Sequence, residues 1–217
     1  VRRGFLGLKS DDIKLGNLSQ GSQRSDAVKV ANLGQSPLNV QFSDVTEGMK
    51  ISVSPNPVPA GQTATMSFIV TADRSKWGKN YYYATPVLNG RKYSPVGIWA
   101  FTKEDFSGWT DEQTADGPKP MLETSSFDFG KRRVGDRFTA TFKVRNLGGS
   151  ALKIYKADPE LPAVTPEPFQ DTPSGKESIL RFKVDSSTLP AGEVSILVIL
   201  TTNSPLRPIG NIHITGT

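Results

Sequence analysis

Val-Ala-Asn-Leu-Gly at residues 30–34 and Val-Arg-Asn-Leu-Gly at residues 144–148 decide the fold, because this short motif occurs twice, 114 positions apart. The same offset, applied without a gap, pairs residues of like character along both stretches: Gly16 with Gly130, Gly21 with Gly135, Leu38 with Leu152, Pro59 with Pro173, Gly61 with Gly175, Phe68 with Phe182, Val70 with Val184, Gly78 with Gly192, Asn89 with Asn203 and Ile98 with Ile212. Glycine and proline suit turns, and the apolar pairs suit strands. The sequence therefore predicts two copies of one domain.

Each copy shows the alternation of apolar and polar residues that is typical of half-buried strands. Residues 138–144 and 180–184 alternate in this way, whereas residues 194–200 are apolar on both sides, as in a central strand. Roughly seven short strands per copy, separated by turn signals, predict an all-β chain of two tandem immunoglobulin-like β-sandwiches. We expect Phe68 and Phe182 in the two cores.

Two turn motifs occur in both copies. Asn-Leu-Gly-x-Ser, at residues 32–36 and 146–150, contains residue types that tolerate positive φ and predicts a hairpin between neighbouring strands. Pro-x-Gly, at residues 59–61 and 173–175, predicts a turn with proline at its second position.

The boundaries follow from the repeat and from a change in composition. We expect a first sandwich over residues 1–101, a joint over 102–120 and a second sandwich over 121–217. The joint is acidic, with 5 acidic and 2 basic side chains. Thr110-Asp111-Glu112-Gln113 has the form of a capping box and predicts a short helix after Thr110. Pro118 and Pro120 would end that helix and favour an extended, semi-rigid chain.

Composition excludes several classes of site. The 217 residues include no Cys and one His, which excludes disulfides, thiolate nucleophiles, Cys-bound metal clusters and multi-His metal sites. We therefore expect no cofactor and no metal site. No apolar run approaches the length of a membrane span. The net charge of +5 is spread thinly along the chain, which argues against nucleic-acid binding.

Several motifs carry a resemblance to a known family. The second copy contains Phe127-Asp128-Phe129-Gly130, Val134-Gly135-Asp136 and residues 142–148 (Phe-Lys-Val-Arg-Asn-Leu-Gly), and the first copy matches more loosely through Leu15-Gly16, Gly21 and Asn32-Leu33-Gly34. This pattern resembles the bacterial domain-of-unknown-function family 1573, which is related to the ASH and major-sperm-protein-like branch of immunoglobulin-like sandwiches.

Further stretches resemble multi-copy Bacteroidetes members of that family: residues 7–10, Lys76-Trp77-Gly78, residues 103–107 and Asp111-Glu112-Gln113. The resemblance covers nearly the whole chain. It implies an exported protein, periplasmic or on the cell surface, with another copy upstream and an export signal outside this segment. Many members carry Cys-Gly-Cys-Thr where residues 156–162 read Lys-Ala-Asp-Pro-Glu-Leu-Pro, so no role of those cysteines carries over.

Candidate catalytic residues are few. Glycoside hydrolysis needs two carboxyl groups roughly 5–10 Å apart. The available acid pairs are Asp11 with Asp12, Asp111 with Glu112, and Asp158 with Glu160. All fall at expected strand ends, in loops or in the joint, where acids are mostly solvated. His213 falls in the last strand, facing away from Ile212 and Ile214. A catalytic base needs a nucleophile and an orienting group nearby, but the sequence contains no Gly-x-Ser-x-Gly elbow, and Trp99 takes the matching place in the first copy, so a surface histidine is favoured. We predict no catalytic residue and no enzyme.

Two surface features remain. Lys131-Arg132-Arg133 is the only basic run and falls in an expected turn, where solvation is the default and an anionic glycan or lipid headgroup is the alternative ligand. Trp77, Tyr81, Tyr82 and Tyr83 cluster in the first copy alone. In a strand, Tyr81 and Tyr83 share one face and Tyr82 takes the other. These four residues are the candidate ligand or partner surface, against the alternative that they only fill the core.

The sequence thus favours a non-catalytic extracytoplasmic binding or spacer module, whose partner is an unidentified protein or glycan of the cell envelope. The alternative is a carbohydrate-binding accessory domain that uses the first-copy aromatics. The first 101 residues carry 12 basic and 6 acidic side chains, which would favour an acidic partner. A third hypothesis, a hydrolase, would need acids that converge in a cleft.

Overall fold

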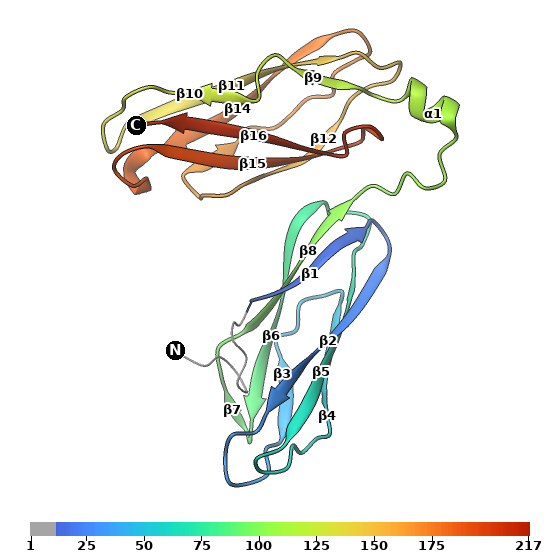
Figure 1. The fold of residues 1–217 in the computed structure, drawn as a ribbon, viewed down its shortest axis with the longest axis vertical. Helices are drawn as coiled ribbons and strands as arrows, with labels where there is room; N and C mark the ends of the chain where they lie inside the picture. The colour runs from blue at the N-terminus through green and yellow to red at the C-terminus, as the bar shows by residue number, and fades with distance from the viewer. Residues whose placement is uncertain (1–11) are drawn as a thin grey trace. The chain divides into compact units, whose positions relative to one another are not determined.

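The computed structural model describes residues 12–217 and is built mainly from β-strands (Figure 1). The chain divides into two compact units, Val1–Thr102 and Lys103–Thr217. Residues 7–10 and Asp11, which the sequence motifs include, lie outside the described residues. Within the described residues, no helix is both long and apolar enough to cross a membrane.

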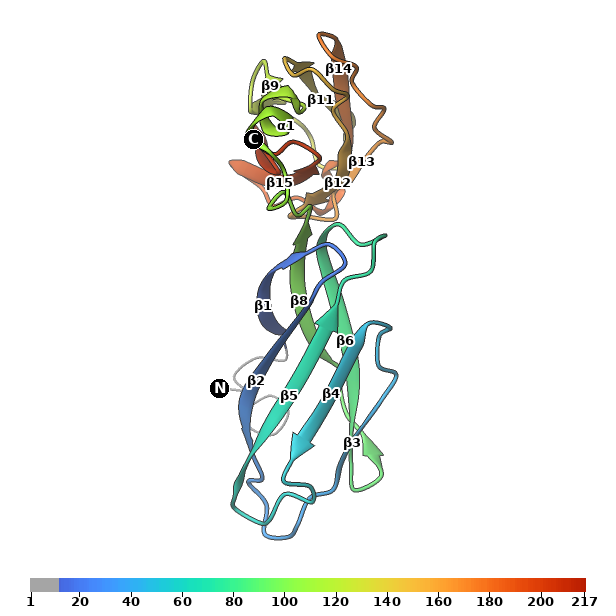
Figure 2. The ribbon, with the colours of Figure 1, turned by 90° about the vertical axis from the view of Figure 1, so that its right-hand side faces the viewer.

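The first unit consists of two sheets (Figure 2). One has the strand order β2 (Gln23–Ala31), β5 (Thr63–Thr71), β4 (Met49–Ser54). The other has the order β1 (Asp12–Ser19), β8 (Val96–Lys103), β6 (Gly78–Leu88), β3 (Val40–Ser43), and β7 (Arg91–Lys92) joins β6. Side chains from both sheets meet in the core, where Met66, Phe68 and Tyr82 are almost completely buried.

The second unit also consists of two sheets. One has the order β13 (Val164–Pro166), β14 (Glu177–Asp185), β11 (Arg137–Asn146), β9 (Pro120–Leu122). The other has the order β10 (Ser126–Asp128), β16 (Ile209–Gly216), β15 (Val194–Thr202), β12 (Ile154–Pro159). A 3₁₀ turn, Ser186–Thr188, follows β14. The core includes Phe142, Phe182 and Ile212.

The topology is that of an immunoglobulin-like sandwich. In the second unit the first edge strand is split, so that β9 pairs antiparallel with β11 in one sheet and β10 pairs parallel with β16 in the other. The remaining strands divide between the sheets as in immunoglobulin domains. The predicted all-β fold of immunoglobulin-like sandwiches is confirmed. Phe68 and Phe182 are 1% and 0% exposed, so both predicted core positions are correct.

The Asn-Leu-Gly-x-Ser motif does not form the predicted hairpin. The strand before it, β2 or β11, and the next strand, β3 or β12, lie in different sheets. The buried asparagine decides this path, because its side-chain amide ties the loop to a distant turn. Asn32 Nδ2 donates to the carbonyls of Ser36 (2.8 Å) and Val58 (3.0 Å). The loop therefore carries the chain across the end of the sandwich.

The Pro-x-Gly turns also differ from the expected form. Gln62 N donates to the carbonyl of Pro59 at 3.1 Å, which makes proline the first residue of the turn rather than the second. Gly61 then occupies the third position with φ +69°, a left-handed conformation that glycine adopts without steric cost. In the second unit, Lys176 N bonds the carbonyl of Pro173 in the same way at 3.0 Å.

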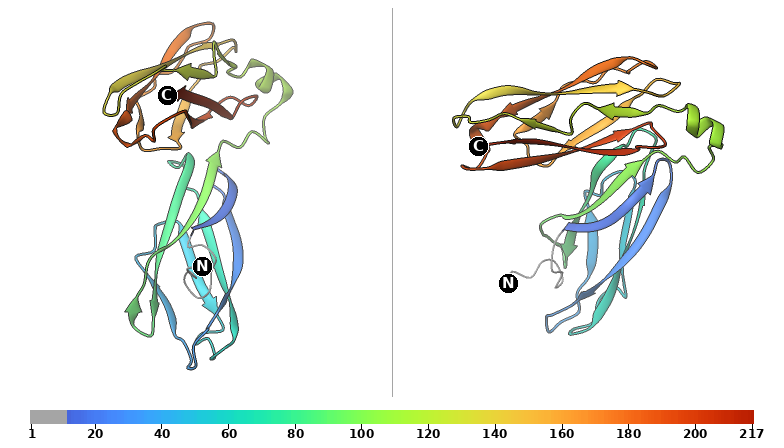
Figure 3. Two further views of the ribbon diagram at one scale, coloured as in Figure 1. Left: turned by 60° about the vertical axis from the view of Figure 1, so that its left-hand side comes forward. Right: turned by 45° about the horizontal axis from the view of Figure 1, so that its top comes forward.

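A short helix, α1 (Asp111–Asp116), lies in the predicted joint and is visible as the green coil in Figure 3. Its capping box is complete. Gln113 N donates to Thr110 Oγ1 at 3.1 Å, and Thr110 N donates to Gln113 Oε1 at 2.8 Å. The two bonds satisfy backbone donors that the helix itself leaves free.

The segment after α1 is held by the second unit. Leu147 N donates to the carbonyl of Lys119 at 2.9 Å, and Ser204 Oγ donates to the carbonyl of Pro118 at 2.6 Å. A methyl group on Gly148 would collide with the carbonyl oxygen of Gly117, so this close approach requires glycine. The end of the joint is therefore an ordered part of the second unit.

Candidate functional site

Two exposed tyrosines mark the outer face of the sheet that contains β6 and β8. Tyr81 and Tyr83 are 38% and 45% exposed, because alternate residues of β6 point away from the core. Their ring centroids lie 5.8 Å apart and the ring planes differ by 10°. Tyr81 stands opposite Trp99 on β8, and Tyr83 stands opposite Gly97. We call Tyr81, Tyr83 and Trp99 the aromatic row.

Two lysines place positive charge beside the aromatic row. Lys79 Nζ lies 4.7 Å from the ring centre of Trp99 and 5.2 Å from that of Tyr81. Lys14 Nζ, from β1, lies 5.3 Å from the ring centre of Trp99. These distances fall within the range of cation–π attraction, which fixes the ammonium groups against the rings. The row thus offers tyrosine hydroxyls and ring surface beside two positive charges.

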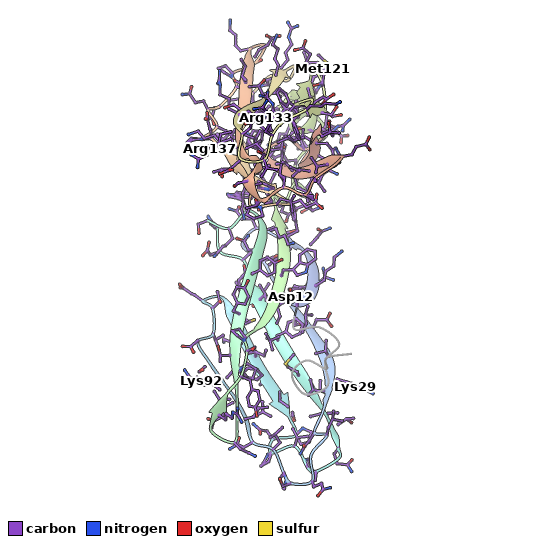
Figure 4. The ribbon with its side chains drawn as sticks, turned by 90° about the vertical axis from the view of Figure 1, so that its left-hand side faces the viewer. Asp12, Lys29, Lys92, Met121, Arg133 and Arg137 are labelled. Atoms are coloured by element: carbon purple, nitrogen blue, oxygen red, sulfur yellow. The ribbon has the colours of Figure 1, made fainter. Side chains whose placement is uncertain are left out.

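Gly97 lets the row lie close to the backbone of the sheet. A methyl group on Gly97 would come within 2.9 Å of Asp12 Oδ1 and 3.1 Å of Tyr83 Cε1. A larger residue here would displace one of these side chains. Asp12, which is labelled in Figure 4, is the first residue of β1. The row is therefore bordered by one carboxylate at Tyr83 and by two lysines at Trp99.

Tyr82 does not belong to the surface, which corrects the predicted set of four residues. Its side chain is 1% exposed and packs in the core, because it alternates with Tyr81 and Tyr83 along β6. Among residues 12–217, its hydroxyl finds no hydrogen-bond partner. Burial raises the pKa of the Tyr82 hydroxyl, and the nearby charge of Asp73 adds to the effect.

Trp77 lies in the loop before β6 and is half-buried. Its carbonyl accepts a hydrogen bond from Asn80 Nδ2 at 3.0 Å. Trp99 is the third residue of the row. It was not among the residues predicted for the site. The signal that identifies Trp99 is its pairing with Tyr81, which requires the register of β6 and β8.

The structure describes both members of two predicted acid pairs, whereas Asp11 of the third pair lies outside the described residues. Asp158 makes an ion pair with Lys156 at 3.1 Å, and Glu160 Oε2 accepts a hydrogen bond from Leu197 N at 3.0 Å. Asp111 and Glu112 lie exposed in the first turn of α1. Each of these carboxylates is thus engaged in local structure or solvated. Across residues 12–217, no group of three His, Cys, Asp or Glu side chains could hold a metal ion.

His213 and the basic run also have structural surroundings. His213 is half-buried on β16, and its backbone N donates to the carbonyl of Ser125 at 2.9 Å. Arg132 of the basic run lies over the ring of Phe138, with its guanidinium carbon 4.9 Å from the ring centre. Arg132 Nε also donates to the carbonyl of Phe129 at 3.3 Å. The run is a turn in which one cation is anchored to the protein.

One ionisable pair connects the joint to the second sandwich. Tyr155 Oη donates to Glu104 Oε2 at 2.9 Å. Partial burial raises the pKa of the Glu104 carboxyl, and the hydrogen bond from Tyr155 opposes this shift. Burial also raises the pKa of the Tyr155 hydroxyl, and its bond to Glu104 raises it further. The pair fixes the start of the joint and offers no uncommitted acid.

Comparison with known proteins shows the fold. The chain matches no protein-family model and no curated protein. It is similar to a protein of unknown function from Porphyromonas gingivalis, with a TM-score of 0.74 and 17% identity, over 96% of this chain and 97% of that chain. This likeness shows a shared fold along nearly the whole of both chains.

Two further solved structures are similar to this chain with lower TM-scores. The ASH/PapD-like domain of human CEP192 has a TM-score of 0.37 and 12% identity, over 47% of this chain and 86% of that chain. The CupB2 chaperone of Pseudomonas aeruginosa has a TM-score of 0.30 and 10% identity, over 94% of this chain and 98% of that chain. Neither likeness carries an argument about activity.

Proposed function

We propose that this chain is a non-catalytic extracytoplasmic binding or spacer module, built from two copies of one domain of the family 1573 type. Its placement in the periplasm or on the cell surface rests on the sequence resemblance. The proposal of a common domain is supported by hydrogen bonds that recur 114 positions apart. Asn32 Nδ2 bonds the carbonyl of Val58 at 3.0 Å, and Asn146 Nδ2 bonds that of Thr172 at 3.0 Å.

The aromatic row supports a binding role more than any other feature of the described surface. Tyr81 and Tyr83 expose 38% and 45% of their area, although apolar rings gain free energy on burial. Tyrosine binds partners at low entropic cost, since few rotatable bonds must be fixed. Lys14 and Lys79 beside the row favour an acidic partner. The observation that carries the proposal is this exposed, lysine-flanked ring surface.

A capture experiment tests the proposal. Immobilised wild-type protein and the double variant Tyr81→Ala/Tyr83→Ala would be exposed to solubilised cell envelope. We expect a captured component that the double variant loses and that added salt releases, since screening weakens attraction between exposed charges. Tyr93→Ala is the matched control, because Tyr93 is also 45% exposed and lies outside the row. Equal capture by the double variant would contradict binding at the row and favour a spacer.

A carbohydrate-binding accessory domain is the second candidate function. The observation in its favour is the pair of nearly parallel tyrosine rings, since aromatic side chains offer apolar surface with a polar tip. Purified anionic and neutral polysaccharides, titrated against the same variants, separate the candidates. Saturable binding of a polysaccharide that the double variant loses would support this function, and capture of envelope protein alone would favour the first.

A further inference from the structure

The second unit contains an open cavity of about 290 Å³ at one edge of the sandwich. Side chains from both sheets line it, among them Val144 and Leu180 on one side and Leu200 on the other. Met121 of β9 and Ser125, which lies between β9 and β10, also line it. Met121 is 49% exposed and is labelled in Figure 4. The cavity therefore lies over the edge of the core, whose side chains Val144, Leu180 and Leu200 are 0%, 2% and 3% exposed.

Gly210 accounts for the cavity. Gly210 is paired with Leu200 across β15 and β16, and directly opposed residues point to the same face of a sheet. Leu200 is 3% exposed, so Gly210 occupies a core-facing position without a side chain. A methyl group placed on Gly210 would find nothing within 4 Å. Glycine inside a strand costs stability, and it often marks a place where a ligand approaches.

Polar residues also line the cavity. Arg207 and Asn211 line it, beside Ser125 and Gly210. Within residues 12–217, no ion pair or side-chain hydrogen bond engages the Arg207 guanidinium. A free guanidinium beside an apolar chamber suits an anionic group, because arginine binds carboxylates through two parallel hydrogen bonds.

We propose that the second unit binds an unbranched acyl chain that ends in a carboxylate, with the chain in the cavity and the carboxylate at Arg207. The volume is sufficient, since an apolar cavity of about 150 Å³ binds benzene. Ligand sites are commonly apolar with a few polar groups that fix orientation, which is the character of this cavity. The proposed acyl-chain site is formed by the second unit and the aromatic row by the first, so the two proposals can be tested independently.

Decanoate and decan-1-ol are suitable probes, because they have the same chain and differ in charge at the end group. Each would be titrated into the full-length protein, with amide chemical shifts followed by heteronuclear NMR. We expect saturable shifts at lining residues such as Leu180, Leu200 and Gly210, and tighter binding of decanoate. Arg207→Gln should weaken decanoate about tenfold, as expected for a lost charged hydrogen bond, and leave decan-1-ol unchanged. Arg181→Gln, an exposed arginine on β14, is the matched control.

Gly210→Leu tests the cavity itself by filling it. It should abolish binding of both probes while the double variant Tyr81→Ala/Tyr83→Ala binds them as the wild type does. Absence of saturable shifts in the wild type, or unchanged binding by Gly210→Leu with native spectra, would overturn the proposal. Equal loss of both probes in Arg207→Gln would overturn the assignment of the carboxylate to Arg207.

Discussion

Asn146 donates a hydrogen bond from Nδ2 to the carbonyl oxygen of Thr172 at 3.0 Å, in the interior of the second unit. The same side chain donates to the carbonyl of Ser150 at 2.7 Å and accepts from the backbone N of Gly148 and Lys119. One buried amide thus holds a crossing loop, a distant turn and the end of the joint. Buried polar groups with complete partners specify one arrangement of the chain, because an unsatisfied group costs free energy.

The first prediction concerns these asparagines. Asn146→Ala should lower the free energy of unfolding of the second unit by about 3 kcal/mol, because buried carbonyl and amide groups lose their partner. Asn32→Ala should lower the free energy of unfolding of the first unit by a similar amount, because Asn32 makes the equivalent bonds to Ser36, Val58 and Gly34. Hydrogen exchange resolved by peptide mass spectrometry measures both units in the intact chain. A loss below about 1 kcal/mol in either variant would contradict the structural role assigned to its buried asparagine.

The second prediction concerns the Tyr82 hydroxyl, which is buried and has no hydrogen-bond partner in the part of the chain that the structure describes. Tyr82→Phe should leave the first unit as stable as the wild type or stabilise it by about 1 kcal/mol, since it removes an unsatisfied group and keeps the ring. Tyr82→Ala should cost about 3–5 kcal/mol through the cavity that it creates. Urea unfolding measures the stability of both variants. Tyr81→Phe is the control, because Tyr81 is exposed. A clear loss in Tyr82→Phe would mean that the hydroxyl has a partner.

The same hydroxyl predicts alkaline sensitivity. Its folded-state pKa is raised, so the neutral form is favoured in the folded protein. The resulting stability is complete below the unfolded-state pKa of about 10 and is lost as the pH rises through the folded-state value. The advantage of Tyr82→Phe over the wild type should therefore grow above about pH 10.

The core residues were predictable because burial follows from a local rule. Alternation along a strand places Phe68 and Phe182 inward whatever the partner strand is. The same rule separated Tyr82 from Tyr81 and Tyr83, although it could not say which face was the core. The positions of Trp99 and Gly210 in their sites depend instead on strand register. Their roles follow from which residue stands opposite in the next strand, and register is set by turns and packing that a single sequence does not display.

The paths of the Asn-Leu-Gly loops were missed for a related reason. Turn-forming residues predict a change of direction, and a hairpin is the shortest way to make one. The side-chain amide of Asn32 instead donates a hydrogen bond to the carbonyl of Val58, a residue 26 positions away. A contact of this length is invisible to any local pattern, which is why the turn was predicted and its connection was wrong.

The third prediction concerns Glu104, whose pKa is raised by burial. A carboxyl with a raised folded-state pKa contributes stability below its unfolded-state pKa and loses it as the pH rises through the folded-state value. Glu104→Gln cannot ionise, and its amide oxygen can still accept the bond from Tyr155. The variant should therefore gain stability relative to the wild type as the pH rises from about 4 to 7. Thermal unfolding across this range measures the difference. A difference that does not change with pH would contradict the burial of this carboxyl.

The last prediction concerns the boundary of the second unit. A fragment of residues 121–217 follows the boundary expected from the sequence, and it lacks the first residue of β9 together with Pro118 and Lys119. A fragment of residues 103–217 retains the whole compact unit. We expect the longer fragment to unfold in one cooperative transition with a β-type circular dichroism spectrum. The shorter fragment should be less stable by at least about 3 kcal/mol, because it loses the three hydrogen bonds made by Pro118 and Lys119, each worth about 1 kcal/mol. It also loses the bonds that Gly149 and Ser150 donate to the Asp116 carbonyl and the bond from Tyr155 to Glu104.

The three bonds made by Pro118 and Lys119 are Lys119 N to Asn146 Oδ1, Leu147 N to the Lys119 carbonyl, and Ser204 Oγ to the Pro118 carbonyl. A fragment of residues 117–217 keeps all three while it removes Glu104 and α1, so it is the matched control. Its stability should lie close to that of 103–217 if the bonds after α1 are decisive. If it instead equals that of 121–217, the helix and the Glu104–Tyr155 contact hold the unit together. A disordered 103–217 fragment would contradict an independently folding second domain.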